Sequence, residues 1–141
     1  MKQGRIKSLN NNPVQNGKYV LYWMQASQRA KNNHALELAI KKANNLNQPL
    51  IVFFGLTSDF PEANARHYYF MLEGLREVQE KLKNRNIKMV VRQTVPSQGA
   101  KKLAAEASLV ITDRGYLKVE KDWKEKVANS ISCPLLQVES D

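Results

Sequence analysis

The sequence predicts an α/β fold in which five parallel strands form a sheet with helices on both faces. Two observations predict this fold. Short, continuous apolar runs of strand length recur along the chain, as expected for strands that are buried on both faces. Segments with apolar residues at helical spacing lie between these runs, and such alternation is typical of a parallel sheet covered by helices.

Five apolar runs are the predicted strands. The first, residues 19–24, reads YVLYWM. It is too short for a helix and is rich in aromatic and β-branched residues, which favours a buried strand. The other four runs have the same character, the last of them more weakly: residues 50–54, 87–91, 109–112 and 135–138.

Four helices are predicted between these strands, at residues 33–46, 62–85, 97–106 and 118–129. Asn33 is the expected N-cap of the first helix. Pro61 suits the lead into the second helix, and Ser97 lies near the start of the third.

The order of these elements limits the topology. Right-handed crossovers leave few arrangements, and we expect a Rossmann-like sheet of order 3-2-1-4-5, with strands counted along the chain. The flavodoxin-like order 2-1-3-4-5 is the alternative. Residues 1–17 are polar, rich in Asn and without periodic pattern, so we predict a lead-in over 1–17 and one α/β domain over 18–141.

The chain carries a formal charge of +9, with 22 basic and 13 acidic residues. The basic residues are dispersed and often alternate with acids, so most are expected on solvated helix faces. A weak, non-specific attraction to DNA would still follow. The apolar runs are too short to span a bilayer, and the single cysteine, Cys133, allows no internal disulfide. These features predict a cytoplasmic protein without a membrane partner.

The predicted ligand site lies at one edge of the sheet. Open parallel sheets bind ligands beyond the carboxyl ends of their strands, where the strand order reverses. Here that point falls between the strands at 19–24 and 109–112. The candidate ligand-binding residues at this edge are Met24, Gln25, Ser27, Arg29, Phe54, Gly55, Asp113 and Arg114.

Several of these candidates also have a purely structural interpretation. Ser27 could cap the next helical turn in a loop that starts a helix. Asp113 and Arg114 could pair locally. The sequence has no G-x-G-x-x-G or Walker A motif and no Cys/His spacing suited to zinc, so neither a dinucleotide site nor a metal site is predicted. We predict no catalytic residue.

Several strings, in order along the chain, resemble class II cyclobutane pyrimidine dimer photolyases. YVLYWMQASQR at 19–29 and NHAL at 33–36 are similar to the family's opening strand and loop. FFGL at 53–56, FPEANARHY at 60–68 and FMLEGL at 70–75 are similar to its second strand and helix. The resemblance ends with TDRGYL at 112–117 and the segment from Cys133 to Asp141.

This resemblance implies a light-dependent DNA repair enzyme. The family uses reduced FAD and blue light to split dimers in UV-damaged DNA. FAD and the flipped-out dimer bind in a C-terminal helical domain. The N-terminal Rossmann-like domain can hold an antenna pigment, a deazaflavin or a folate, which passes excitation energy to the flavin.

The sequence stops at Asp141, where the family's linker would begin. We therefore expect the chain to lack the FAD domain, to bind no FAD and to be inactive alone. Its expected partners are that FAD domain and, through the whole enzyme, damaged DNA. The face that would meet the FAD domain is expected to be exposed and to allow self-association, which sedimentation would test.

The leading hypothesis is an antenna-pigment and scaffold domain. Met24 and Phe54 would be apolar contacts of the pigment, and the polar contacts would come from Gln25, Ser27, Arg29, Asp113 or Arg114. One alternative is a structural module that contacts the helical domain or DNA without a pigment. Another is a stand-alone nucleotide-binding α/β protein, which the absence of a Gly-rich loop disfavours.

Overall fold

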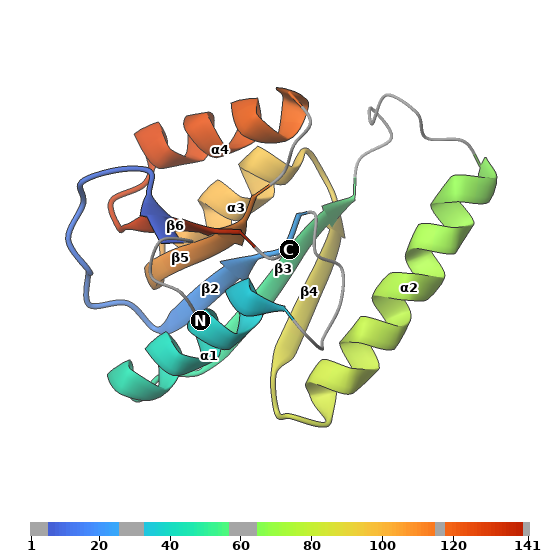
Figure 1. The fold of residues 1–141 in the computed structure, drawn as a ribbon, viewed down its shortest axis with the longest axis horizontal. Helices are drawn as coiled ribbons and strands as arrows, with labels where there is room; N and C mark the ends of the chain where they lie inside the picture. Colours follow the sequence, from blue (N-terminus) through green and yellow to red (C-terminus); the bar gives the residue numbers. More distant parts are fainter. Residues whose placement is uncertain (1–5, 26–32, 57–64, 115–117, 140–141) are drawn as a thin grey trace.

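A mostly parallel sheet between two layers of helices forms the protein (Figure 1). The computed structural model describes residues 6–25, 33–56, 65–114 and 118–139. Within these ranges the strands stand in the order β1-β6-β5-β2-β3-β4. Their bounds are β1 (Ile6–Ser8), β2 (Tyr19–Trp23), β3 (Leu50–Leu56), β4 (Lys88–Gln93), β5 (Ala107–Asp113) and β6 (Leu135–Val138).

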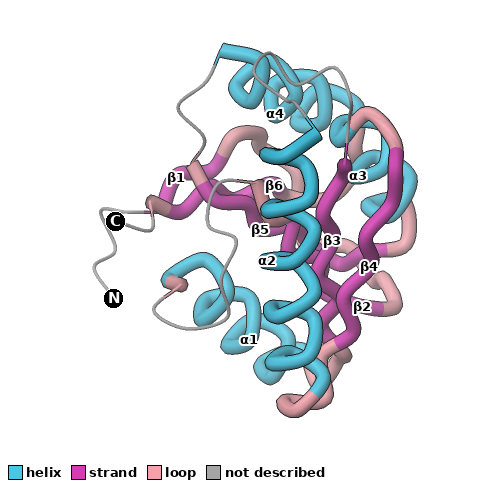
Figure 2. The backbone as a smooth tube through the Cα atoms, turned by 90° about the vertical axis from the view of Figure 1, so that its right-hand side faces the viewer, coloured by secondary structure: helices cyan, strands magenta, loops and turns pink. Residues whose placement is uncertain are grey.

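The helices cover both faces of this sheet, as expected. Their bounds are α1 (His34–Leu46), α2 (Ala65–Lys83), α3 (Pro96–Ala104) and α4 (Lys118–Ser130). Apolar side chains of α1 and α2 form one core cluster with the sheet, and those of α3 and α4 form another. The tube in Figure 2 shows these helices around the strands.

The prediction of five strands was wrong, because the sheet has a sixth strand, β1, at one edge. The full strand order therefore differs from the predicted one. The five parallel strands follow one another as β4-β3-β2-β5-β6, which is 3-2-1-4-5 when these five are numbered alone. In the flavodoxin-like alternative, the third of these strands would lie beside the first, whereas β2 pairs with β3 and β5.

Strand β1 lies within the polar lead-in and pairs antiparallel with β6, Ile6 opposite Val138. It has three residues and one apolar side chain that packs on the core, Ile6, so no period-2 pattern marks it.

The Asn residues after β1 have a structural role. The Asn10 amide nitrogen donates to the carbonyls of Ala128 and Cys133, both at 3.1 Å, and its oxygen accepts from Leu135 N at 3.2 Å.

The continuous apolar runs are explained by burial on both faces of the sheet. Every residue of β2 and of β5 is buried. Along β2, Val20 and Tyr22 face the cluster with α1 and α2, whereas Leu21 and Trp23 face the cluster with α3 and α4. Because burial of one large apolar side chain stabilises a fold by roughly 1.5–3 kcal/mol, these two strands anchor the domain.

The predicted N-cap of the first helix is confirmed. Asn33 has extended backbone geometry, and its side chain accepts from Leu36 N at 3.1 Å. The helix ends at Asn47, which adopts the left-handed conformation with φ 55°, a conformation that Asn tolerates better than most residues. Pro96 occupies the first turn of α3, where its missing N–H costs no hydrogen bond.

Candidate functional site

The carboxyl ends of β2, β3 and β5 lie at one edge of the sheet, as the parallel pairing requires. Trp23 pairs with Phe53 on one side and with Thr112 on the other. The chain crosses from β2 to β3 in one direction, and β5 lies on the opposite side of β2. The strand order therefore reverses at β2, where open α/β sheets bind ligands.

Asp113 is the polar centre of this edge. It ends β5, and its side chain is completely buried. Its carboxylate accepts from Tyr22 Oη at 2.8 Å and from the backbone N of Gln25 at 3.1 and 3.2 Å. Asn33 Nδ2 donates to Tyr22 Oη at 3.0 Å. Asp113 thus joins the ends of β2 and β5 to the start of α1, and it orients the residues that follow β2.

Thr112 and Trp23 complete the polar connections at the end of β2. Thr112 Oγ1 donates to the carbonyl of Trp23 at 2.7 Å and lies 3.4 Å from Gln25 Oε1. Trp23 is fully buried in the cluster with α3 and α4. Its indole N–H has no hydrogen-bond partner in the part of the chain that the structure describes. A buried donor without an acceptor costs free energy, so this atom marks a place where an acceptor would be favourable.

The two apolar candidates are packed in the core. Met24 is fully buried and Phe54 nearly so, and both belong to the cluster with α1 and α2. Their role as ligand contacts stays a prediction.

Gly55 has a packing role that the structure explains directly. A Cβ atom at this position would lie 2.7 Å from Pro96 Cα and 3.0 Å from Pro96 Cβ. Such distances are far below van der Waals contact. Only Gly therefore lets β3 approach the first turn of α3 so closely.

Arg114 lies just beyond β5 and is half-exposed, and its guanidinium forms an ion pair with Glu139. Its backbone N donates to the carbonyl of Val138 at 3.0 Å. Arg114 is therefore bound to residues at and just beyond the end of the neighbouring strand β6, and it borders the edge. Two further candidates, Ser27 and Arg29, lie outside the described residues.

Sequence reasoning missed a group of polar residues beside α4, of which Lys124 is the most buried. Positions 120, 123, 124, 127 and 128 all lie on the buried side of this helix. Lys124 therefore occupies a place in an apolar stripe, between Trp123 and Val127. A lysine at such a place in the helical period was the signal that could have found it.

Cys133 is buried beside α3. Burial raises the pKa of its thiol from 9.0 to about 11, so at pH 8 only roughly a thousandth would be thiolate. We expect Ellman's reagent at pH 8 to label the folded chain far more slowly than the urea-unfolded chain. Equal labelling rates in the folded and unfolded chains would contradict this buried environment of the thiol.

The raised pKa of Cys133 also predicts that the free energy of unfolding falls as pH rises from 9 towards 11, because the thiol of the unfolded chain ionises first.

In the described ranges, no group of three or more His, Cys, Asp or Glu side chains could hold a metal ion. No helix among the described residues is long and apolar enough to cross a membrane. On α2, Tyr69 is 72% exposed and Leu72 is 40% exposed; self-association through such a surface stays a prediction.

Comparisons with known proteins agree with the resemblance at the level of the photolyase family. A model of the DNA photolyase family matches residues 20–141. The chain is 51% identical over 138 residues to the deoxyribodipyrimidine photo-lyase of Methanothermobacter thermautotrophicus, a match that covers 97% of this chain and 31% of that protein. It is 34% identical over 124 residues to the deoxyribodipyrimidine photo-lyase of Arabidopsis thaliana, covering 86% of this chain and 25% of the relative. The chain thus spans less than a third of the length of these relatives.

Solved structures show the same fold at low sequence identity. A bacterial class III photolyase from Agrobacterium tumefaciens superposes with a TM-score of 0.70 at 16% identity, over 89% of this chain and 26% of that one. A universal stress protein in complex with cAMP gives a TM-score of 0.58 at 16% identity, over 89% of this chain and all of that one. At these identities the likeness shows the fold alone.

Proposed function

Because the chain belongs to the DNA photolyase family, we propose that it is the pigment-holding N-terminal domain of a class II deoxyribodipyrimidine photolyase. The observation that carries the pigment role is the polar network around Asp113, at the point where the strand order reverses. The class II type is supported by the strings at 19–29, 53–56 and 112–117.

The residues at this edge fit a planar aromatic pigment with acceptor atoms. The indole N–H of Trp23 is a buried donor without a partner in the described ranges, and a ring carbonyl or ring nitrogen would supply its acceptor. The guanidinium of Arg114 lies beyond β5 and is half-exposed. A bound deazaflavin or folate would supply absorption of light and transfer of excitation energy.

The protein's own contribution would be to position and shield the pigment. Asp113 would act indirectly, since its carboxylate is occupied by Tyr22 Oη and Gln25 N and is completely buried. It would fix the direction in which the chain leaves β2. Met24 and Phe54 would limit the depth to which the pigment enters the core. Ser27 and Arg29 remain candidate polar contacts from the sequence alone.

The rest of the repair reaction would belong to the part of the relatives that this chain does not span. We propose that FAD and the pyrimidine dimer bind there. On this proposal the chain contributes light harvesting and a scaffold, and repair activity requires the whole enzyme.

Fluorescence titration with a deazaflavin and, separately, with a folate tests the pigment proposal. We expect saturable binding of one of them. Arg114→Gln should weaken that binding roughly tenfold, the effect of losing one charge-assisted hydrogen bond. Arg85→Gln is the matched control and should bind like the unmodified chain, because Arg85 also pairs with a glutamate but precedes β4, at the opposite end of the sheet. Absence of saturable binding for both pigments would contradict the proposal.

Two separate hollows with basic linings, one near each end of the edge strand β4, favour a second candidate function, a DNA contact. A hollow of about 600 Å³ beside α2 is lined by Arg76, Lys83 and Lys88, with Glu80 as its acidic member. A second hollow of about 580 Å³ includes Arg92 and Lys102. Lys on an edge strand also prevents strand-to-strand aggregation, which is the simpler explanation of Lys88.

Duplex DNA binding at physiological salt separates these explanations. Binding that persists there and is weakened by K88E/R92E would support a DNA contact. Binding that disappears between low and moderate salt would mean non-specific attraction alone.

A further inference from the structure

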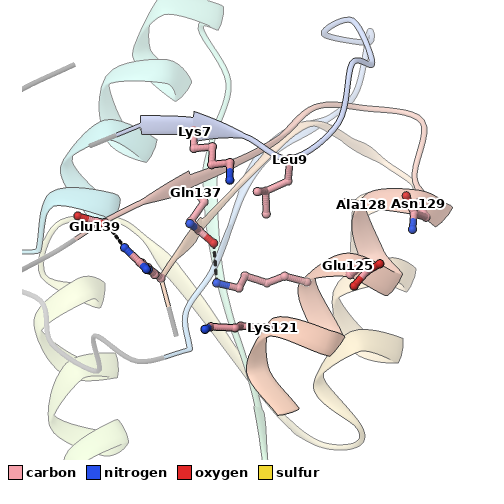
Figure 3. A pocket seen from close by; sticks show the side chains of 10 residues that line it. Lys7, Leu9, Lys121, Glu125, Ala128, Asn129, Gln137 and Glu139 are labelled. Carbon is pink, nitrogen blue, oxygen red and sulfur yellow. Dashed lines mark hydrogen bonds and ion pairs between the residues drawn. The ribbon is translucent and has the colours of Figure 1, made fainter. Parts of the chain in front are cut away.

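A pocket of about 460 Å³ lies beside α4, apart from the β2 end of the sheet edge. Figure 3 shows that β1, the end of β6 and one side of α4 form it. Among the candidate pigment residues in the described ranges, Arg114 alone lines it. Its volume falls within the range of small-molecule sites and far exceeds the volume of one water molecule.

Cationic side chains dominate the lining of this pocket. Lys7, Lys121 and Lys124 extend toward the same space near Gln137 (Figure 3). None of these three lysines forms an ion pair within 4.0 Å among the described residues. The acidic members of the lining are Glu125 and Glu139, and Glu139 is paired with Arg114. The pocket therefore has an excess of positive charge.

Lys124 distinguishes this pocket from an ordinary basic surface. Lys124 is only 3% exposed, and its Nζ donates to Gln137 Oε1 at 2.6 Å. An ammonium group has three donor hydrogens, and removing it from water is costly unless it gains partners. Burial accordingly lowers the pKa of Lys124, although Asp113 and Glu120 favour its charged form. An anion in the pocket would offset this cost.

We propose that the α4 pocket is a binding site for a small molecule with a multiply charged oxyanion group, a phosphate or a dicarboxylate. Lys124 is the buried donor of this site. Lys7 extends into the pocket from β1, and Lys121 extends into it from α4, one turn before Lys124. This site does not depend on the pigment proposal, and a chain that binds no pigment would still have it.

Equilibrium dialysis with inorganic phosphate, and separately with succinate, tests the site at constant ionic strength set with sodium chloride. We expect saturable binding of about one anion per chain for at least one of the two probes. K124Q should weaken it roughly tenfold or more, the usual effect of losing a hydrogen bond from a charged group. Phosphate binding alone would identify a phosphate ester as the ligand class, and succinate binding alone would identify a dicarboxylate.

K126Q is the matched control, because Lys126 is exposed on the same helix and does not line the pocket. It removes the same charge and should leave the affinity unchanged. If K124Q does not fold, the exposed Lys121 provides the second variant, and K121Q should weaken binding severalfold. Binding of neither anion, or equal weakening by K126Q, would overturn the proposal. Lys124 would then serve only as a counter-charge to Asp113 and Glu120.

Discussion

Asp113→Ala is expected to lower the free energy of unfolding by about 3 kcal/mol or more. The substitution removes the acceptor of Tyr22 Oη and of Gln25 N in a fully buried place. Each buried polar group left unsatisfied costs roughly 1–3 kcal/mol, and loss of a network adds to these costs. Urea unfolding followed by circular dichroism measures the change.

Tyr22→Phe provides the comparison within the same network. It removes the hydroxyl, which also accepts from Asn33 Nδ2, but leaves the carboxylate bound to Gln25 N. We therefore expect a loss of about 1–2 kcal/mol, smaller than that of Asp113→Ala. Asp113→Ala could instead change the free energy of unfolding by less than about 0.5 kcal/mol, the range of ordinary surface substitutions. That result would show that Asp113 does not hold this edge together.

Gly55→Ala is expected to destabilise the domain by about 1–3 kcal/mol, the usual cost of overpacking. The new Cβ would lie 2.7 Å from Pro96 Cα. Because that atom is backbone, the first turn of α3 must shift away from β3. The same unfolding experiment measures this loss.

Gly74→Ala is the matched control. Gly74 lies within α2, and a Cβ there meets no atom within 4 Å. This substitution should stabilise the chain by roughly 0.5–1 kcal/mol, because Ala favours a helix more than Gly does. If Gly55→Ala were as well tolerated as Gly74→Ala, the close approach of β3 and α3 would not be the reason for Gly55.

The apolar pattern predicted the parallel strands because burial on both faces leaves a continuous run. Tyr19–Trp23 and Ala107–Asp113 are the clearest cases, with every residue buried. The pattern could not predict β1. Its three residues owe their place to pairing with β6 and to side-chain hydrogen bonds from Asn10, and such long-range partners leave no local period.

The topology expected from the sequence brings the ends of β2, β3 and β5 to one edge of the sheet, as the structure has them, but the sequence could not assign roles to the residues there. Gly55 is explained by Pro96, which is 41 positions later in the chain. Asp113 was expected as a ligand contact or a local partner, whereas it binds Tyr22 on the neighbouring strand β2 and Gln25 just after that strand. Lys124 was overlooked because it reads as one of many helix-face lysines until its burial is seen.

The most direct test of the pigment role is the near-ultraviolet and visible absorption spectrum of the purified chain, before and after a deazaflavin is added. We predict a pigment band that shifts on binding and saturates at about one pigment per chain. A spectrum that remains the sum of protein and unbound deazaflavin at every ratio would contradict the antenna role of this domain and leave it as a scaffold.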